Sequence, residues 1–405
     1  MTNQPATDSD RRAFFQAFDN VNLADVRRRK GAKWNKHDGD VLAAWVADMD
    51  FPPPPMIQNA LAQLAATGDY GYPQLGDPTT VATTFAAWAE RRYGWAVDPE
   101  RVQLTVDVLQ PIAIALELFS EPGDGVVLQT PIYPPFLKVL ELSGRTLVDH
   151  PLGPAAAGYP LDIPGLRALV NDRTRIMLLC NPHNPTGRVF RRDELQALGD
   201  LAVERDLVVV SDEIHADFVY PPHQHISFST LGPKIAARTI TLTSSTKTFN
   251  IAGLRIALAV FGSAALHETY AAKPRFLWGG VSVAGAVASV AAWTEGDAWA
   301  DAQLEYLEGN RRFVTDFVAE HLPGISLATP EATYLAWLDC RDLLRTSGLR
   351  DKTAAEHFLD HGVAMNDGAD FGVHGEGFVR LNFATSRQLL TAVLERLAAA
   401  VNAAA

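Results

Sequence analysis

Between residues 101 and 260, short runs of β-branched and other hydrophobic residues alternate with stretches in which hydrophobic positions recur about every 3.6 residues. This alternation is typical of parallel strands joined by crossover helices. Helices are predicted at 111–119, 133–142 and 191–205. The pattern predicts one α/β sheet, mostly parallel and covered by helices, whose seven strands are 102–106, 126–130, 146–150, 175–180, 207–212, 239–244 and 256–261.

The pattern changes after residue 280 and predicts a smaller α+β region. The N-terminal residues are too few and too interrupted by glycine and proline to fold alone, so we expect them to pack on that region. The sequence therefore predicts a large α/β domain over 48–294 and a small domain built from 1–47 and 295–405. The elements expected after the sheet are helices at 283–293, 299–321 and 389–404 and strands at 333–338 and 377–383.

Composition and charge restrict the class of protein. Of the 405 residues, 47% are hydrophobic and 20% are charged, which is typical of a globular chain. The formal net charge is -12 and no long basic run is present, so we expect no nucleic acid ligand. The longest weakly polar stretch, 281–293, is shorter than the ~20 residues that span a bilayer, so we expect no membrane contact. The lack of a secretory signal and the presence of only two cysteines, Cys180 and Cys340, indicate a cytoplasmic protein.

Lys247 is the first candidate for chemistry. It follows a predicted strand and the hydroxyl-bearing residues 243–246. Ligands of α/β proteins bind at the carboxyl ends of parallel strands, and a lysine amine that is shielded from water there can form a Schiff base. A surface lysine after a strand is the alternative interpretation of its position alone.

Three further features bear polar groups that fit a binding site. The loop 180–187, Cys-Asn-Pro-His-Asn-Pro-Thr-Gly, follows a hydrophobic strand and offers the side chain of Asn184. Asp212 ends the most hydrophobic strand of the chain, where a carboxylate needs a partner such as a pyridinium nitrogen. Arg380 lies in a β-like segment, and its guanidinium group is suited to bind a carboxylate with two hydrogen bonds. A structural ion pair with an Asp or Glu is the alternative for Arg380.

Together these features resemble the aspartate-aminotransferase-like family of pyridoxal phosphate enzymes, which has fold type I. The resemblance rests on the Asn-Pro-x-Asn-Pro-x-Gly loop, the aspartate at a strand end, Ser-x-x-Lys at 244–247 and the late arginine, in the family's order between about residues 34 and 383. A narrower resemblance to the cystathionine β-lyase branch of carbon–sulfur lyases rests on His183 and on the segments 45–51, 211–215, 247–254 and 332–337.

The resemblance implies pyridoxal 5'-phosphate as cofactor, an amino acid as substrate, and a role for each candidate residue. Lys247 would bind the cofactor covalently and take the α-proton of the substrate. Asp212 would keep the pyridine nitrogen protonated. Tyr133 would stack on the ring, and Asn184 would donate to its phenolic oxygen. The substrate-binding residues would be Arg380, which holds the carboxylate, with Asn184 and Ala47.

The cofactor phosphate would lie at the start of the helix that opens near Pro111, where free backbone amides favour an anion. Asp107 departs from the family's pattern, because an acidic side chain is unfavourable beside a phosphate dianion. We expect Asp107 to point away from the phosphate and to cap the helix. The implied phosphate ligands are the amides of Val108 and Leu109, the Ser244 hydroxyl and the Arg255 guanidinium.

Tyr72 lies in the sequence Tyr-Gly-Tyr at 70–72. It matches a family tyrosine that reaches the phosphate bound by the neighbouring subunit. The resemblance therefore implies a symmetric homodimer with shared active sites, in which Tyr72 joins Lys247 and Asp212 as a catalytic residue.

The narrower resemblance implies a carbon–sulfur β-lyase that cleaves L-cystathionine or related cysteine thioethers to a thiol, pyruvate and ammonia. A class I/II aminotransferase would use the same cofactor residues and is the main alternative. The segment 47–51, Ala-Asp-Met-Asp-Phe, and His183 favour the lyase. A non-catalytic regulatory role is known among relatives of this branch, and the intact Lys247 and Arg380 argue against a loss of chemistry.

A metal enzyme is a further alternative, because four potential ligands lie close together in the sequence. Two prolines at 221–222 interrupt this cluster, and no second cluster completes a coordination shell, so no metal is expected. The four residues are His215, Asp217, His223 and His225.

Overall fold

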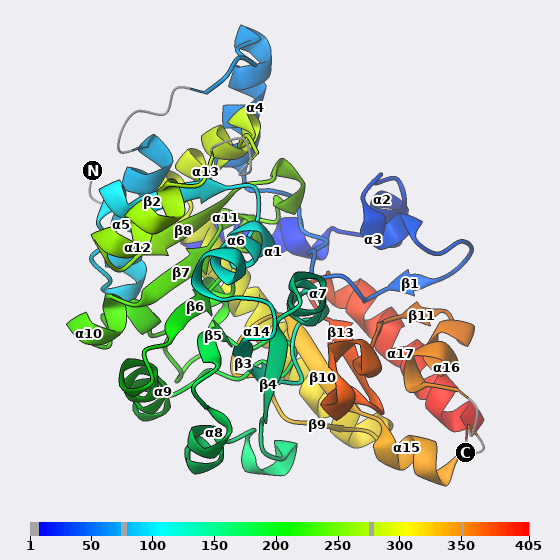
Figure 1. Ribbon diagram of the computed structural model, residues 1–405. Helices are drawn as coiled ribbons and strands as arrows, with labels where there is room; N and C mark the ends of the chain where they lie inside the picture. The colour runs from blue at the N-terminus through cyan, green and yellow to red at the C-terminus, as the bar shows by residue number, and fades with distance from the viewer. Residues whose placement is uncertain (1–7, 74–78, 275–278, 348, 350–351, 405) are drawn as a thin grey trace.

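The structure is a computed structural model that describes residues 8–73, 79–274, 279–347, 349 and 352–404. Its largest element is a seven-stranded sheet with the strand order β2-β8-β7-β6-β5-β3-β4, which runs through the middle of the molecule (Figure 1). All seven predicted strands are confirmed. The strands are β2 (Val102–Thr105), β3 (Gly125–Thr130), β4 (Thr146–Pro151), β5 (Thr174–Cys180), β6 (Val208–Asp212), β7 (Thr239–Thr243) and β8 (Ala257–Phe261).

The direction of β8 corrects one detail of the prediction. β8 runs antiparallel to both β2 and β7, whereas the other four neighbouring pairs are parallel. The sheet is therefore mostly parallel, but the pattern of strand and crossover helix does not extend to the last connection. A parallel connection needs a long crossover, and the segment between β7 and β8 holds only the short helix α11 (Ser245–Thr248) and a 3-10 turn, Ala252–Leu254.

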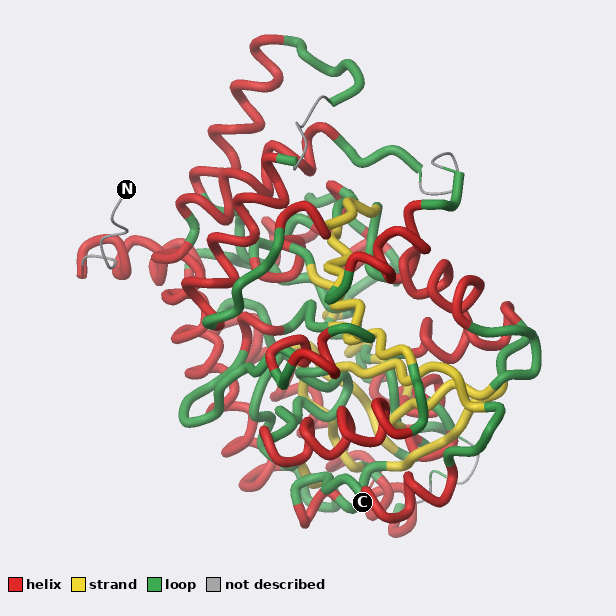
Figure 2. The backbone as a smooth tube through the Cα atoms, turned by 60° about the vertical axis from the view of Figure 1, so that its left-hand side comes forward, coloured by secondary structure: helices red, strands yellow, loops and turns green. Residues whose placement is uncertain are grey.

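Helices cover both faces of the sheet (Figure 2), because side chains along each strand alternate between two apolar clusters. In β3, Val126 and Leu128 belong to the cluster under α6, α7 and α12, and Val127 belongs to the cluster under α8, α9 and α10. The helices are α6 (Leu109–Phe119), α7 (Pro134–Ser143), α8 (Ile163–Leu169), α9 (Arg192–Glu204), α10 (Pro233–Ala236) and α12 (Ala264–Ala271).

A third group of helices packs beside the β2–β8 edge and shares one core with it. Helix α13 contacts both α4 and α5, and α4 leads outward from the body toward residues 68–73 (Figure 1). Among the described residues, no helix has the length and hydrophobicity needed to cross a lipid bilayer. These helices are α4 (Pro55–Thr67), α5 (Thr80–Tyr93), α13 (Val283–Glu295) and α14 (Asp297–His321).

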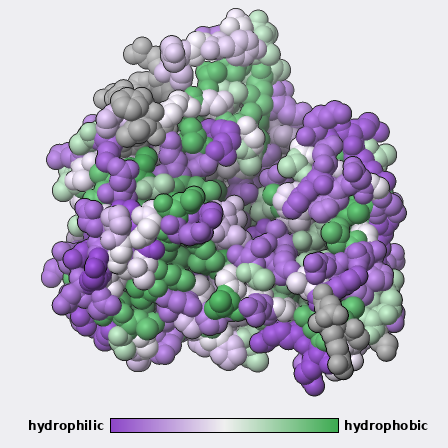
Figure 3. Space-filling model, turned by 45° about the vertical axis from the view of Figure 1, so that its right-hand side comes forward, coloured by the Kyte–Doolittle hydropathy of each residue, from purple (hydrophilic) through white to green (hydrophobic). Residues whose placement is uncertain are grey.

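The C-terminal part contains an antiparallel sheet with the order β12-β13-β10-β9. The N-terminal residues pack on this part as predicted, because β1 (Leu42–Ala43) pairs with β11 (Val363–Ala364) and α1 (Asp8–Asp19) contacts α14. Figure 3 shows the surface hollowed between this part and the large sheet. The remaining elements are α2 (Leu23–Arg27), α3 (Ala32–Asn35), β9 (Ser326–Leu327), β10 (Leu335–Asp339), α15 (Arg341–Thr346), α16 (Ala354–Asp360), β12 (Asn366–Asp367), β13 (Phe378–Asn382) and α17 (Arg387–Ala404).

The strands of the seven-stranded sheet all fall within 48–294, and those of the antiparallel sheet all fall within 295–405. The domain boundaries at 47/48 and 294/295 stay a prediction. Cys180 and Cys340 are both buried free thiols.

Candidate active site

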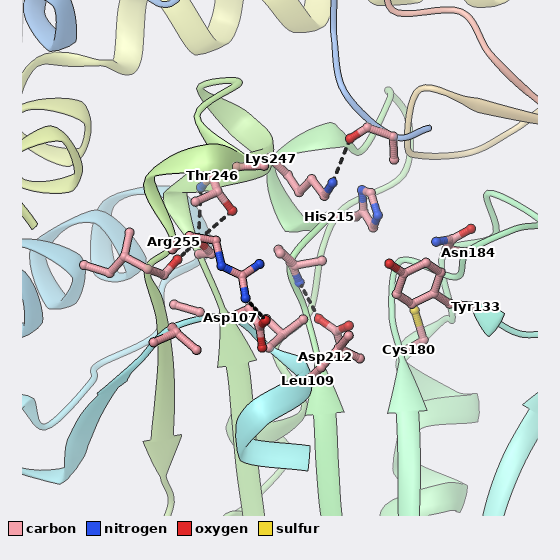
Figure 4. A pocket seen from close by; sticks show the side chains of 18 residues that line it. Asp107, Leu109, Tyr133, Cys180, Asn184, Asp212, His215, Thr246, Lys247 and Arg255 are labelled. Atoms are coloured by element: carbon pink, nitrogen blue, oxygen red, sulfur yellow. Dashed lines mark hydrogen bonds and ion pairs between the residues drawn. The ribbon is translucent and has the colours of Figure 1, made fainter. Parts of the chain in front are cut away.

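A pocket of about 160 Å³ lies at the carboxyl ends of β5, β6 and β7, the edge at which α/β sheets bind ligands (Figure 4). Cys180 and Asp212, the last residues of neighbouring strands, stand side by side in its wall. Arg380 and Tyr72 do not line the pocket. The other nine of the eleven residues predicted for the site do: Ala47, Val108, Leu109, Tyr133, Asn184, Asp212, Ser244, Lys247 and Arg255.

Lys247 lies in α11, directly after β7, and points into the pocket (Figure 4). Its Nζ donates a hydrogen bond of 2.7 Å to the carbonyl oxygen of Ala47. The turn that carries Lys247 is held in place by a hydrogen bond of 2.6 Å that Thr248 Oγ1 donates to Asp217 Oδ2. Burial lowers the pKa of Lys247, and the carboxylate of Asp48 opposes that shift. A lysine with a lowered pKa has more of its amine in the neutral form that acts as nucleophile and base.

Asp212 ends β6 with only 4% of its surface exposed. Its Oδ1 accepts a hydrogen bond of 3.1 Å from the Ile214 amide, and it forms no ion pair with the described residues. Burial raises the pKa of Asp212 to about 7, although this amide lowers it. A cationic group placed beside the carboxylate would reverse the shift.

Arg380 lies in β13 and is almost completely buried. Its Nη1 donates to Asn184 Oδ1 at 2.9 Å, and its Nη2 donates to Asn366 Oδ1 at 2.7 Å. Its Nε is buried without a partner, and no Asp or Glu among the described residues forms an ion pair with it. Burial lowers the pKa of Arg380 to about 10. The structural ion pair considered as the alternative for this arginine is therefore absent from the described part of the chain.

The start of α6 forms the opposite end of the pocket. The first N–H groups of a helix have no acceptor within the helix, so those around Val108 and Leu109 suit an anion. Asp107 caps this helix as expected, because its Oδ1 accepts from the Gln110 amide at 2.9 Å. The expectation that it points away is wrong, because Asp107 lines the pocket and forms an ion pair with Arg255. The arginine predicted as the phosphate's counter-charge is thus already paired with a carboxylate.

Ser244 and Tyr133 also lie at the pocket, in different settings. Ser244 Oγ donates to the Ile256 carbonyl oxygen at 2.6 Å, which ties the end of β7 to the start of β8. The Tyr133 ring precedes α7 and packs edge-on against Phe136, with 5.7 Å between the ring centroids. Tyr72 is fully exposed at the far end of the segment that follows α4.

His215 also lines the pocket, although no role in cofactor or substrate binding was predicted for it. It is buried and has an Nδ1 without a hydrogen-bond partner in the described chain. Burial lowers the pKa of His215 to about 3, and the nearby Lys247 cation contributes, so the imidazole is neutral. Its ring lies 6.0 Å from that of Tyr334, edge to face. The one signal in the sequence is its position three residues after Asp212, where the chain leaves the sheet.

Two residues of the metal alternative, His225 and Asp217, have other partners. His225 Nε2 lies 2.9 Å from Glu213 Oε2, and Asp217 accepts hydrogen bonds from Tyr93 and Thr248. Within the described ranges, no group of three or more His, Cys, Asp or Glu side chains is placed to hold a metal ion. Asp217 thus supports the turn that carries Lys247.

Comparison with known proteins defines the class to which this fold and pocket belong. The chain is a member of the class I and II aminotransferase family, whose family model matches residues 46–397. Cystathionine beta-lyase PatB of Bacillus subtilis (strain 168) is 35% identical over 381 residues, which make up 92% of this chain and 97% of that protein.

Two crystal structures extend the similarity to the whole fold. The structure of OvoB is 38% identical in sequence, with a TM-score of 0.88 over 95% of this chain and 98% of that chain. The PLP-bound C-S lyase from Staphylococcus hominis is 29% identical, with a TM-score of 0.89 over 95% and 98% of the two chains. The family and the fold class predicted from the sequence are confirmed.

Proposed function

We propose that the chain is a pyridoxal 5'-phosphate-dependent carbon–sulfur β-lyase that cleaves L-cystathionine or a related cysteine thioether to a thiol, pyruvate and ammonia. The observation that carries the proposal is that one pocket is lined by the half-buried Lys247 and the buried Asp212, in a chain similar over almost its whole length to a cystathionine beta-lyase. The likeness to a PLP-bound C-S lyase structure supports the same cofactor and reaction.

The pocket's polar groups fit this cofactor. The raised pKa of Asp212 is that of a buried carboxylate with no ion-pair partner in the described part of the chain, and a protonated pyridine nitrogen would supply one. At the other end, the amides at the start of α6 and the Arg255 guanidinium are donors suited to a phosphate. Lys247 supplies an amine with a lowered pKa within the same cavity.

When bound, the cofactor supplies an electron sink for the charge that develops on the substrate's α-carbon. Lys247 is the base that takes the α-proton, since burial favours its neutral amine. Asp212 would stabilise a positive charge on the cofactor's ring nitrogen, and Tyr133 would supply an aromatic surface for the ring. Asn184 would offer its amide nitrogen to the cofactor's phenolic oxygen, because its Oδ1 already accepts a hydrogen bond from Arg380. These roles are common to elimination and transamination, and the similarity to a cystathionine beta-lyase favours elimination of the β-thiolate.

Arg380 is proposed to bind the substrate carboxylate; it does not line the pocket itself but donates a hydrogen bond to Asn184, which does. A buried guanidinium without an anionic partner is costly, and the carboxylate common to all amino acids would supply that partner through a charge-assisted hydrogen bond. Asn184 and Ala47 complete the substrate-binding surface, because both line the pocket. The preferred ligand is therefore a small molecule with an α-carboxylate.

Product analysis tests the reaction. With L-cystathionine, the enzyme is expected to release homocysteine, pyruvate and ammonia without an added keto acid. Transamination would instead require a keto acid and would accumulate a new amino acid, and that result would replace the lyase with an aminotransferase. Borohydride reduction followed by peptide mapping should leave the pyridoxyl group on Lys247, and a label on another lysine would contradict the assignment.

The active unit is proposed to be a homodimer with Tyr72 reaching the partner's phosphate site. Two observations support this proposal. Tyr72 is fully exposed, and an apolar groove on α6 and α7 shares Val106, Asp107 and Leu109 with the pocket. Leu142, in the same groove, is 75% exposed, and a second copy of the chain would cover it.

A cytoplasmic location is the remaining proposal. It is supported by two free thiols in a 405-residue chain, since cysteines stay reduced in the cytosol. Fractionation of cells that produce the protein tests this location.

A further inference from the structure

The segment from Trp45 to Met49, named here the strap, is held by side chains of distant parts of the chain. Each of its five successive carbonyl oxygens accepts a hydrogen bond from a side chain. The donors are Arg380 to Trp45 O (3.2 Å), Asn382 to Val46 O (2.6 Å), Tyr334 to Ala47 O (2.9 Å), Asn382 and Lys33 to Asp48 O (2.7 and 3.0 Å), and Asn250 to Met49 O (2.9 Å).

The central oxygen of the strap, Ala47 O, has two donors. One is Lys247 Nζ at 2.7 Å, for which this is the one hydrogen bond to the described residues. The other is the hydroxyl of Tyr334 at 2.9 Å. A carbonyl oxygen has two lone pairs, so both bonds form together. The direction in which Ala47 O points therefore depends on Tyr334, and the position of the lysine amine depends on Ala47 O.

We propose that Tyr334 is a positioning residue that fixes the Ala47 carbonyl as the acceptor that aims the Lys247 amine at the substrate's α-carbon. The proposal rests on the proposed function, in which Lys247 takes the α-proton. A lysine side chain has several rotatable bonds, and proton transfer needs the amine within hydrogen-bonding range of the α-carbon. A neutral carbonyl also suits a base that must give its proton up again, whereas a carboxylate would hold the ammonium as an ion pair.

The surroundings of Tyr334 make its hydroxyl a fixed point. The residue is completely buried directly before β10, and its ring packs edge-on against Phe218 with 4.9 Å between centroids. The ring therefore keeps its place when the oxygen alone is removed. Tyr220 offers a matched comparison, because it is also completely buried and its hydroxyl donates to the neighbouring carbonyl oxygen of Thr333 at 2.7 Å.

The first test compares Tyr334→Phe with Tyr220→Phe in the cofactor-loaded enzyme. Both variants lose one buried tyrosine–carbonyl hydrogen bond. Tyr334→Phe is expected to lower kcat roughly tenfold while KM stays nearly constant, because the amine is misplaced but the substrate contacts remain. The isotope effect of α-deuterated substrate on kcat is expected to rise. Tyr220→Phe should leave kcat and the isotope effect unchanged. A Tyr334→Phe enzyme with the parent's kcat and isotope effect would overturn the proposal.

The second test needs no turnover. Competitive acylation of the cofactor-free protein across a range of pH, read by peptide mapping, measures the pKa of Lys247. We expect a lower Lys247 pKa in Tyr334→Phe, because the Ala47 carbonyl is then no longer held in place and stabilises the lysine ammonium less. We expect no change of this pKa in Tyr220→Phe. Asn382→Ser loosens the strap at the two flanking carbonyls and should lower the pKa in the same direction. An unchanged Lys247 pKa in both strap variants would contradict the proposal.

The two tests separate this inference from the proposed function. The isotope effect applies to transamination as well, because that reaction also removes the α-proton. If the enzyme proves to be an aminotransferase, the lyase proposal fails while the comparison of Tyr334→Phe with Tyr220→Phe still decides the role of the strap. The acylation test depends on neither reaction.

Discussion

Arg380 donates a hydrogen bond of 2.9 Å from Nη1 to Oδ1 of Asn184, although the two residues are 196 positions apart in the sequence. The bond fixes which way the Asn184 amide points, so that its nitrogen is left for the pocket. Because we propose that Arg380 binds the substrate carboxylate and Asn184 the cofactor, this one contact couples the two binding events.

Replacement of Arg380 should therefore affect both ligands. Arg380→Lys keeps a positive charge but loses the planar fork, and we expect kcat/KM for amino-acid substrates to fall about a hundredfold, which corresponds to roughly 2.7 kcal/mol. Cofactor affinity should fall by a smaller factor, because Asn184 is no longer oriented. Steady-state kinetics and cofactor titration measure the two effects. A double-mutant cycle of Arg380→Ala with Asn184→Ala, read as cofactor affinity, should be non-additive. Additive losses would show that the contact carries no coupling.

The ion pair of Asp107 with Arg255 leads to an opposite prediction, a gain of cofactor affinity on mutation. Asp107→Asn keeps an oxygen for the Gln110 amide and removes the negative charge, so Arg255 becomes free for the phosphate. We expect cofactor binding to tighten roughly threefold to tenfold, with the modest size set by the solvent exposure of the pair.

Asp98→Asn is the control for this variant. Asp98 also caps a short helix and pairs with an arginine, Arg101, away from the pocket, so its loss should leave cofactor affinity unchanged. Equilibrium titration of the cofactor-free proteins with pyridoxal phosphate measures both variants. Weaker binding in Asp107→Asn would mean that the carboxylate supports the phosphate end by orienting Arg255.

The raised pKa of Asp212 predicts how the stability of the cofactor-free protein depends on pH. An aspartate in the unfolded chain has a pKa of about 3.9, and burial raises that of Asp212 to about 7 in the folded protein. Between these values the folded state keeps a proton that the unfolded state has lost. The free energy of unfolding therefore falls as the pH rises through this window, relative to Asp212→Asn, which does not titrate.

Urea unfolding of the cofactor-free parent and Asp212→Asn, from about pH 4 to about pH 8, measures this difference. The parent's free energy of unfolding should exceed that of Asp212→Asn by the largest amount at the acid end of this range. Bound cofactor should flatten the curve, because a cationic ring nitrogen favours the ionised carboxylate. A difference in the free energy of unfolding that does not change with pH would show that burial does not raise the pKa of Asp212.

The fold was predictable where one local pattern sets an element. The β-branched runs of the large sheet and the periodic helices were placed within a few residues, because each must bury one or both faces. The direction of β8 was not predictable, since it depends on the connection from β7 and not on the strand's own residues. The pairing of β1 with β11 was also missed, because a strand of two residues has no periodicity.

The candidate site likewise contains residues that local patterns predict and contacts that they do not predict. Lys247, Asp212 and Asn184 follow strands of one sheet, so their positions in the sequence already place them at one edge. The role of Tyr334 depends on a carbonyl oxygen 287 positions away, and the ion pair of Asp107 depends on an arginine 148 positions away. No local pattern records such contacts. The rule that a carboxylate avoids a phosphate site predicted that the Asp107 side chain points away from the pocket. This prediction was wrong because the rule took no account of the neighbouring Arg255 cation.

The shared dimer site gives the last prediction, which concerns two variants that restore each other. Lys247→Ala removes the base, and Tyr72→Ala removes the exposed tyrosine proposed to reach the partner's site. Each homodimer then has two damaged sites. In a heterodimer with sites built from both chains, one site lacks both residues and the other combines the intact Lys247 of one chain with the intact Tyr72 of the other.

The two nearly inactive variants should therefore regain activity when they are unfolded together and refolded as a mixture. Random pairing makes half of the dimers heterodimers, each with one intact site, so activity should approach about a quarter of the parent's. Sedimentation and mass spectrometry of differently tagged chains verify that the chains have exchanged. If exchange is complete and the mixture remains as inactive as its components, Tyr72 does not act across an interface, because the intact combination would then be present without effect. A fully active monomer would contradict the shared site in the same way.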